Sequence, residues 1–330
     1  MNSTRLFYIS FLRVVAMSMV VLFHCLAYYS DSIWQYPDPD VEGYGIFAHF
    51  LNVIDMPMFV FISGFLYSYL REAKGKYKDN MAFVKNKVRR LMVPYLFWGV
   101  VLLLLFPDKH ASDMFIGISH LWFLLMLFGL FLLVHFTYPF LRSLTPFRLV
   151  LLLCLSFLLY PLGVKFHFAS NYFCIDRILM YLPYFLVGGG SYLLSTSLKK
   201  LRHALPATLI LLVVLFLLTT YVLPSVPSLV IYPIQFLFVS MFLVCCFGYF
   251  SQLPPAVLHF QGLNSLDRCS MGIYILHHIL IAFPLQWPTV RAVMNGYWWL
   301  CPWLMFLVVY ALSWILTAAL LKTRLSIVIG

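Results

Sequence analysis

Charged side chains are scarce in this sequence. Only 10% of the 330 residues are Asp, Glu, Lys or Arg, whereas 63% are hydrophobic and the mean hydropathy is +0.93. Soluble domains carry about 25% charged and about 45–50% apolar residues. No polar stretch exceeds about twenty residues, so we expect no appended soluble domain. The composition therefore indicates an integral membrane protein.

Several chemical signatures are also missing. The seven cysteines show neither paired metal-ligand spacing nor an extracellular disulfide framework, and they are expected to pack as small apolar side chains. The chain has no P-loop, no G-x-G-x-x-G and no G-x-S-x-G motif. It has no internal repeat, which weakens an inverted-repeat transporter interpretation without excluding it. We expect no metal cofactor.

Hydrophobic segments are present in quantity. Windows of roughly 20 residues predict about ten membrane-spanning helices. The predicted spans are 6–30, 46–70, 91–107, 119–141, 148–165, 177–195, 205–223, 230–250, 270–290 and 297–321. The first is expected to be retained, because its apolar region is too long for a signal peptide and no A-x-A site follows. The predicted fold is an all-α polytopic helix bundle, with residues 1–330 forming one membrane-embedded domain.

The net charge is +11, and most of the basic residues lie in particular loops between the predicted spans. Lys and Arg concentrate in alternate segments: 71–90, 142–148, 196–204 and the C-terminal tail. The opposite loops hold most of the acidic residues. By the positive-inside rule both termini are cytoplasmic. Membrane topology thus accounts for the basic character, and no nucleic-acid partner is expected.

Two ionisable side chains interrupt the first apolar stretch, Phe7 to Ser30. Arg13 and His24 are eleven residues apart, or about three helical turns, so they share one face about 16 Å apart. The structural alternative is that Arg13 snorkels to the headgroups and His24 lies near the outer interface. Ionisable residues persist in membranes mainly where they face the bundle interior or a wet cavity. The pattern therefore predicts a polar stripe across much of the bilayer.

Other polar residues in the spans fall at two depths, counted from the span ends. We expect a wet path through them, with its inner end near the basic loop 71–90. The predicted inner layer holds Arg13, Ser63 and His277, and the predicted outer layer holds His24, Asp55 and His120.

Each of these residues also has a structural interpretation. Asp55 could cap or kink the helix before Pro57, His120 could lie at the interface, and Ser63-Gly64 could be a close helix-packing patch. The aromatic and acidic loop 31–44 could be an ordinary interfacial loop or a contact for a sugar.

The chemistry of these residue types favours group transfer over metal chemistry. Histidine with a carboxylate can act as a general base toward a hydroxyl. A basic cluster can hold the phosphates of a soluble donor, and an intramembrane Arg can stabilise a developing oxyanion. The neighbours His277 and His278 are expected to point to different faces, and no Cys/His/Asp cluster has ligand spacing.

Six short motifs follow one another along nearly the whole chain. They are Arg13-x10-His24; Ser63-Gly64 after an aromatic-rich run; Arg89-Arg90 followed by Pro94-Tyr95; HLWFL from His120; Tyr184-Phe185 with Gly188; and Ser270-x-Gly272-Ile273-Tyr274-x-x-His277. In this order they resemble the membrane-bound acyltransferase 3 family. The chain departs from the family where an Asp or Asn usually shortly precedes the Arg, since it reads Ile9-Ser10-Phe11-Leu12 there.

The resemblance implies a multi-pass enzyme of the bacterial inner membrane. Such an enzyme takes an acyl group, commonly acetyl, from cytoplasmic acyl-CoA and passes it to a hydroxyl of a surface glycan or lipid-linked oligosaccharide. Membrane lipid and polysaccharide-assembly proteins are the other expected partners. The extracytoplasmic domain that some members carry is not expected here, so transfer would finish in the membrane domain or on a separate partner.

The resemblance also suggests roles for residues. His24 is expected to be the catalytic base or a transient acyl carrier, with Arg13 placing the donor or its charge. Asp55 and His120 would orient the acceptor or His24. The expected acyl-CoA-binding residues are Arg71, Arg89 and Arg90, with Ser63 and His277 in the second rank.

Two other functions remain open from the sequence. A transporter or flippase of a glycan or lipid-linked precursor could use the same polar stripe as a relay. A silent scaffold for a polysaccharide synthase is also conceivable, although Arg13 and His24 argue against it. Binding of acetyl-CoA would separate the enzyme from the transporter.

Overall fold

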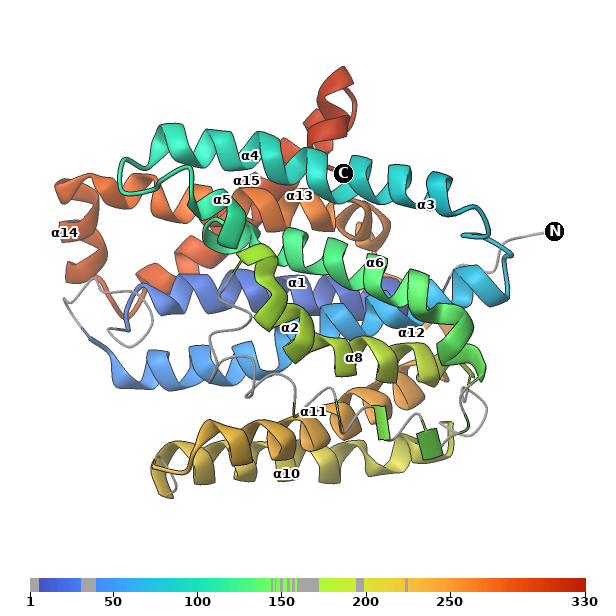
Figure 1. Cartoon of the computed structure of the whole chain (residues 1–330). Helices are drawn as coiled ribbons and strands as arrows, with labels where there is room; N and C mark the ends of the chain where they lie inside the picture. Colours follow the sequence, from blue (N-terminus) through green and yellow to red (C-terminus); the bar gives the residue numbers. More distant parts are fainter. Residues whose placement is uncertain are drawn as a thin grey trace. The chain divides into compact units, whose positions relative to one another are not determined.

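A computed structural model describes residues 6–30, 40–143, 172–193, 199–222 and 225–330, with scattered positions between 145 and 158. All regular structure within these residues is helical (Figure 1). The α-helices are α1 (Phe7–Ala27), α2 (Glu42–Glu72), α3 (Asn80–Lys87), α4 (Val93–Leu105), α5 (Asp113–Ile116), α6 (Trp122–Ser143), α8 (Ile175–Leu193), α10 (Leu205–Leu217), α11 (Ser228–Phe250), α12 (Pro255–Leu258), α13 (Leu263–Ala282), α14 (Pro288–Gly296) and α15 (Cys301–Leu320). Short 3-10 or π turns are η1 (Val88–Met92), η2 (Ser119–Leu121), η3 (Tyr172–Cys174), η4 (Lys199–Ala204), η5 (Leu218–Val222), η6 (Pro284–Gln286) and η7 (Arg324–Val328).

Among the described residues, eight helical segments are long and apolar enough to cross a membrane. They are Phe7–Ala27, Glu42–Glu72, Asn80–Leu105, Asp113–Leu141, Lys200–Val222, Val230–Phe250, Leu263–Gln286 and Cys301–Leu320. These match eight of the predicted spans. The predicted span 177–195 forms α8, which is not one of the eight, and 148–165 lies outside the described residues except for scattered positions. The all-α multi-pass bundle is confirmed, whereas the number of spans and their orientation stay predictions.

Two predicted span starts are wrong by seven residues or more. The third segment begins at Asn80 rather than at 91, so much of the predicted basic loop is helical. Asp79 starts this helix by accepting hydrogen bonds from the backbone N–H groups of Met81 and Ala82, as an N-cap residue does. The ninth predicted span begins at Leu263 rather than at 270, and this shift matters for the site.

A proline shapes the middle of the third segment. Pro94 has no N–H, and its ring crowds the carbonyl of Arg90 four residues earlier. The helix widens into the π turn η1 over Val88–Met92, immediately before the proline, and resumes as α4. Arg89 and Arg90 lie on this widened turn.

The described chain divides into two compact units, each built from separated segments. Unit 1 comprises Met1–Met56, Val93–Ala111 and Pro255–Gly330, and unit 2 comprises Pro57–Met92 and Ser112–Pro254. Both boundaries of the segment 57–92 fall inside helical stretches, and the first coincides with Pro57 in α2.

In unit 1, α1, α13 and α15 pack against one another. A small residue permits the close approach of α13 to α15: a Cβ atom added at Gly272 would lie 2.3 Å from Cγ2 of Thr317. Trp314 of α15 donates its indole N–H to Ser265 of α13 at 2.9 Å. Small residues at membrane helix interfaces let backbones meet and so gain dispersion energy. These contacts hold α13 against α15, and α1, which carries Arg13 and His24, packs against both helices.

In unit 2, α2 and α8 cross at a reciprocal pair of glycines. A Cβ atom at Gly64 would lie 2.0 Å from the carbonyl oxygen of Phe185, and one at Gly188 would lie 2.0 Å from that of Phe61. No side chain fits at either position without moving a backbone. The close-packing interpretation of Ser63-Gly64 is therefore confirmed for Gly64, and it explains Gly188 as well.

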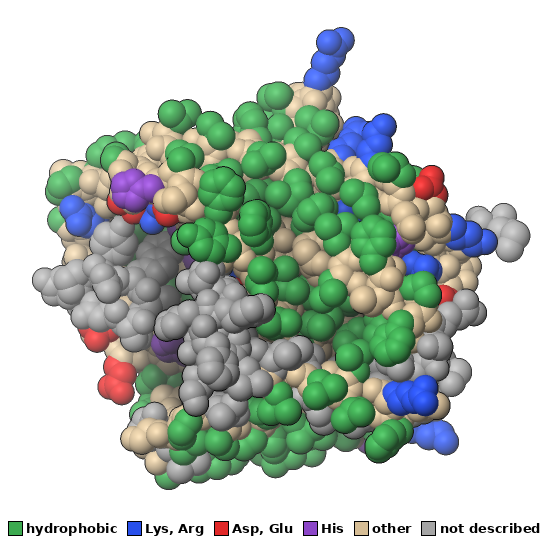
Figure 2. All heavy atoms as spheres, in the orientation of Figure 1, with side chains coloured by type: hydrophobic (Ala, Val, Ile, Leu, Met, Phe, Trp, Pro, Cys, Tyr) green, Lys and Arg blue, Asp and Glu red, His purple; other side chains and the backbone are tan. Residues whose placement is uncertain are grey.

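The described surface is strongly apolar. Figure 2 shows hydrophobic side chains over much of the face in view. On α4, Leu96, Val100 and Leu104 are 53%, 52% and 79% exposed and recur every four residues along one side of the helix. A row of exposed leucine and valine at helical spacing fits a surface that faces lipid rather than water.

Candidate active site

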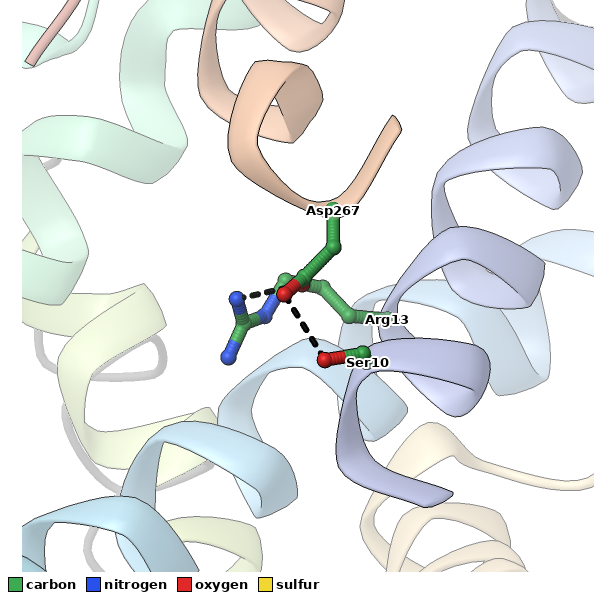
Figure 3. A network of polar contacts seen from close by, with 3 residues as sticks. All are labelled: Ser10, Arg13 and Asp267. Carbon is green, nitrogen blue, oxygen red and sulfur yellow. Dashed lines mark hydrogen bonds and ion pairs between the residues drawn. The ribbon is translucent and has the colours of Figure 1, made fainter. Parts of the chain in front are cut away.

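An ion pair joins the first helix to α13. Arg13 Nη1 lies 2.6 Å from Asp267 Oδ1, and Ser10 donates its hydroxyl hydrogen to Asp267 Oδ2 at 2.8 Å (Figure 3). The side chains of Arg13 and Asp267 are 26% and 12% exposed. A carboxylate that receives bonds on both oxygens balances the arginine charge inside the bundle. The acidic partner missing from the residues before Arg13 is thus supplied by another helix.

Two histidines meet on the same pair of helices. Nε2 of His277 lies 3.3 Å from Nδ1 of His24, and their ring centroids are 4.8 Å apart. His277 is fully buried, and His24 is partly buried. The ring of His278 also lies 5.3 Å from that of His24, so both adjacent histidines of α13 flank it. Arg13 and His24 both face α13, as their spacing predicted.

Contacts with backbone carbonyls show which ring nitrogen of each histidine carries the proton. Nδ1 of His24 lies 2.8 Å from the carbonyl oxygen of Val20, and Nδ1 of His277 lies 3.0 Å from that of Ile273. A carbonyl can only accept, so each neutral ring carries its proton on Nδ1 and its lone pair on Nε2. His24 then presents Nε2 as its basic atom. Its Nδ1–H is shared between Val20 and Nε2 of His277.

The pairing corrects the predicted depth of His277. We expected it beside Arg13, but it contacts His24, and Asp267 occupies the position beside Arg13. The cause is the early start of α13, which moves every residue of that span about two turns deeper. Residue 13 contacts residue 267 and residue 24 contacts residue 277, so the residue numbers rise in the same direction along both helices. Helices α1 and α13 are therefore parallel. We call Ser10, Arg13, His24, Asp267 and His277 the His24 cluster.

The other predicted site residues are distributed over both units. Asp55 is buried in unit 1, where its Oδ1 accepts the N–H of Met56 and its Oδ2 has no partner among the described residues. Asp55 lies inside α2 rather than at its start, and an N-cap bond goes to the second or third residue along, so Asp55 does not cap this helix. His120 is buried in turn η2 of unit 2, and Ser63 is partly buried in the same unit. Both belong to a different unit from His24.

A second polar cluster lies in unit 2 around Arg71. Nη1 of Arg71 donates to the hydroxyl of Tyr67 at 2.7 Å and lies 3.1 Å from Nδ1 of His135. The guanidinium also sits 4.1 Å from the ring centroid of Tyr138, a cation–π distance. No carboxylate forms an ion pair with Arg71 among the described residues. Its direct contacts are therefore neutral groups, while the Glu72 carboxylate accepts the hydroxyl hydrogen of Tyr138.

A buried lysine lies in the same cluster. Lys87 is 7% exposed, and its ammonium sits 3.2 Å from the ring centroid of Phe131. Within the described part of the chain it too has no carboxylate partner. The other predicted donor-binding residues, Arg89 and Arg90, are exposed. Asn80 also joins this cluster, since its Oδ1 lies 3.0 Å from Nε2 of His135. We call Tyr67, Arg71, Asn80, Lys87 and His135 the Arg71 cluster.

Tyr77 borders the Arg71 cluster outside the spans. Its ring stacks on that of Tyr67 with centroids 5.7 Å apart. Burial raises the pKa of the Tyr77 hydroxyl, and the nearby Arg90 opposes this rise. The cationic field of η1 therefore reaches the edge of the Arg71 cluster.

Sequence reasoning missed six residues of these clusters: Ser10, Tyr67, Asn80, Lys87, His135 and Asp267. Asp267 lies three residues before the Ser270–His277 motif, and the requirement that an intramembrane Arg13 have a partner was the signal that could have found it. His135 interrupts the predicted span 119–141 as His24 interrupts the first, and it too is an ionisable residue within an apolar segment. Lys87 was counted only among the loop charges, because the helix over 80–87 was not predicted.

Comparison with known proteins bears on the chemistry of these clusters. No curated protein and no solved structure matches the chain. A family model described as an acyltransferase domain matches residues 6–322, a range that includes both units and both clusters. This multi-pass membrane protein is therefore an acyltransferase and belongs to the acyltransferase 3 family.

Proposed function

We propose that the protein is an O-acyltransferase of the bacterial inner membrane that moves an acyl group, in the first instance acetyl, from cytoplasmic acyl-CoA to a hydroxyl. The acceptor is a surface glycan or a lipid-linked oligosaccharide. The observation that carries the proposal is the orientation of His24. Its Nδ1–H is fixed by Val20 and His277, which leaves Nε2 as a base.

The step at His24 is direct transfer by general base catalysis. Nε2 removes the proton of the acceptor hydroxyl as the oxygen attacks the thioester carbonyl, which forms the new C–O bond. The C–S bond then breaks, and the CoA sulfur leaves with the proton returned by His24. Positive charge on the His24 ring during this step is stabilised by the Val20 carbonyl and by Nε2 of His277, both acceptors of Nδ1–H.

The Arg13–Asp267 pair has a positioning role in this proposal. It links α1 to α13 eleven residues from His24 on one helix and ten from His277 on the other. Fixing the two helices in register keeps the two imidazoles within contact distance. Because Asp267 balances its charge, we assign Arg13 to this role in preference to binding the anionic donor.

The donor is assigned to unit 2. Arg71, Arg89, Arg90 and the buried Lys87 supply cationic groups without carboxylate partners among the described residues. Phosphates of CoA match such a set, because charge-assisted hydrogen bonds to phosphate are strong.

The test uses the full chain in lipid nanodiscs with acetyl-CoA and the glycan fraction of the producing cells. Released thiol and acetylated glycan are measured together, the latter by mass spectrometry. We expect His24→Asn to lower the rate about a hundredfold or more. His49→Asn, an exposed histidine on α2 in the same unit, is the matched control and keeps normal activity.

Two outcomes would overturn the proposal. Near-normal acetylation by His24→Asn protein would remove His24 from the chemistry. Absence of acetyl-CoA binding together with movement of a lipid-linked glycan across proteoliposomes would establish transport instead.

A further inference from the structure

His135 is the buried histidine of the Arg71 cluster. It comes from α6, is 2% exposed and stacks face to face on Phe83 with ring centroids 3.8 Å apart. Both ring nitrogens are engaged. Nε2 lies 3.0 Å from Oδ1 of Asn80, and Nδ1 lies 3.1 Å from both the Tyr67 hydroxyl and Arg71 Nη1. The histidine thus connects α2, α3 and α6.

The partners determine where the proton of His135 resides. The amide oxygen of Asn80 only accepts, so Nε2 carries the hydrogen. The guanidinium of Arg71 only donates, so Nδ1 carries the lone pair. This is the opposite assignment from His24 and His277. A second proton on Nδ1 would face the like charge of the Arg71 guanidinium and would leave the Tyr67 hydroxyl oxygen to accept it.

The neutral ring of His135 can hold Arg71 in place without cancelling its positive charge. Arg71 and Lys87 are both cationic, and no carboxylate ion-pairs with either among the described residues. A carboxylate at position 135 would fix Arg71 equally well, but it would cancel the charge that an anionic ligand needs. An imidazole acceptor fixes the guanidinium and leaves the positive charge available.

We propose that His135 is a positioning residue for acyl-CoA binding, which holds Arg71 through Nδ1 while Asn80 holds its Nε2–H. This proposal rests on the proposed donor role of Arg71. His135 touches no reacting atom in it. Substitution of His135 should therefore change the affinity for the donor and leave the rate of the chemical step unchanged.

The kinetic test measures KM for acetyl-CoA and kcat on the full chain in nanodiscs. His135→Leu removes both nitrogens and is expected to raise KM about tenfold with kcat little changed, as for loss of one hydrogen bond to a charged group. His135→Asn puts an amide oxygen near the position of Nδ1 and is expected to restore much of the affinity. Phe136→Leu, the exposed neighbour on α6, is the control.

A mutant cycle and a spectroscopic readout separate this proposal from the proposed function. In an Arg71→Ala background, His135→Leu is expected to raise KM no further. Nitrogen-15 NMR of labelled histidines, with the His135→Asn protein as the difference reference, should show a protonated Nε2 and a bare Nδ1. Arg71→Ala should shift that Nδ1 signal.

The possible failures are distinguishable. If Arg71→Ala leaves KM unchanged, the donor role of Arg71 fails, and the positioning proposal fails with it even if the NMR signature is as expected. If Arg71→Ala raises KM but His135→Leu does not, only the positioning proposal is overturned. Equal effects of His135→Leu with and without Arg71, or a protonated Nδ1, overturn it as well.

Discussion

The two units each hold a partly buried arginine, and the partners that bind it differ. In unit 1, Arg13 faces the carboxylate of Asp267, which is itself held by Ser10. In unit 2, Arg71 faces a phenol and a neutral imidazole. The hydrogen bonds are of similar length. Arg13 and its carboxylate partner together carry about zero net charge, whereas Arg71 and its neutral partners together carry a positive charge.

This difference separates structural arginines from ligand-binding ones. An arginine paired with a carboxylate contributes to helix association, and removal of either partner leaves an uncompensated charge. An arginine held by neutral acceptors retains its electrostatic attraction for an anion. The comparison predicts that disruption of the His24 cluster lowers stability first, whereas disruption of the Arg71 cluster lowers donor affinity first.

The largest effect on stability is expected from Asp267→Ala. The substitution leaves Arg13 without its carboxylate and frees α1 from α13, at a cost of about 2–3 kcal/mol for a pair that retains some solvent exposure. Thermal unfolding of purified protein in detergent should show a Tm several degrees lower. kcat should fall too, because the register of His24 and His277 is loosened.

Its matched control is Asp108→Ala. Asp108 pairs with Lys109 at 2.8 Å, but the carboxylate is 66% exposed, so loss of the pair should cost no more than about 0.5 kcal/mol. The double variant Arg13→Asp with Asp267→Arg should regain part of the lost Tm. A Tm for Asp267→Ala equal to that of the control would show that the pair does not hold the helices.

The next largest effect is that of Arg71→Ala on the affinity for the donor. KM for acetyl-CoA should rise about tenfold to a hundredfold, as for loss of a charge-assisted contact worth roughly 1.5–3 kcal/mol. Tm should change less than in Asp267→Ala, since Tyr67 and His135 can still bond to each other. Lys76→Ala, which removes an exposed charge from the same segment, is the control. The reverse pattern, a large loss of Tm with an unchanged KM, would contradict the comparison.

The sequence predicted the side of α1 that matters but not its partners. A spacing of eleven residues is a property of one helix, so the shared face of Arg13 and His24 follows from geometry alone. Partners depend on the register between helices, and register depends on where each helix begins. A seven-residue error at the start of α13 was enough to hide Asp267 and to misplace His277.

The helix over 80–87 was missed for a related reason. Hydropathy windows find apolar segments, and this one carries Lys85 and Lys87 with a capping Asp79 before it. Its helical state depends on capping and on packing of its one apolar side, where Phe83 is 1% exposed. Such tertiary contacts are invisible to a window average, so the Arg71 cluster could not be assembled from sequence alone.

The smallest expected effect, and the sharpest in sign, comes from Lys87→Met. A buried ammonium without a carboxylate costs free energy, and methionine fills a similar volume beside Phe131 without that cost. Tm should therefore stay equal or rise by about one to three degrees, while KM for acetyl-CoA rises a few fold and becomes less sensitive to salt. Lys85→Met on the exposed side of α3 should change neither quantity. A fall in both Tm and donor affinity would mean that Lys87 stabilises the fold through Phe131, and unit 2 would then resemble unit 1 in using its buried charge for structure.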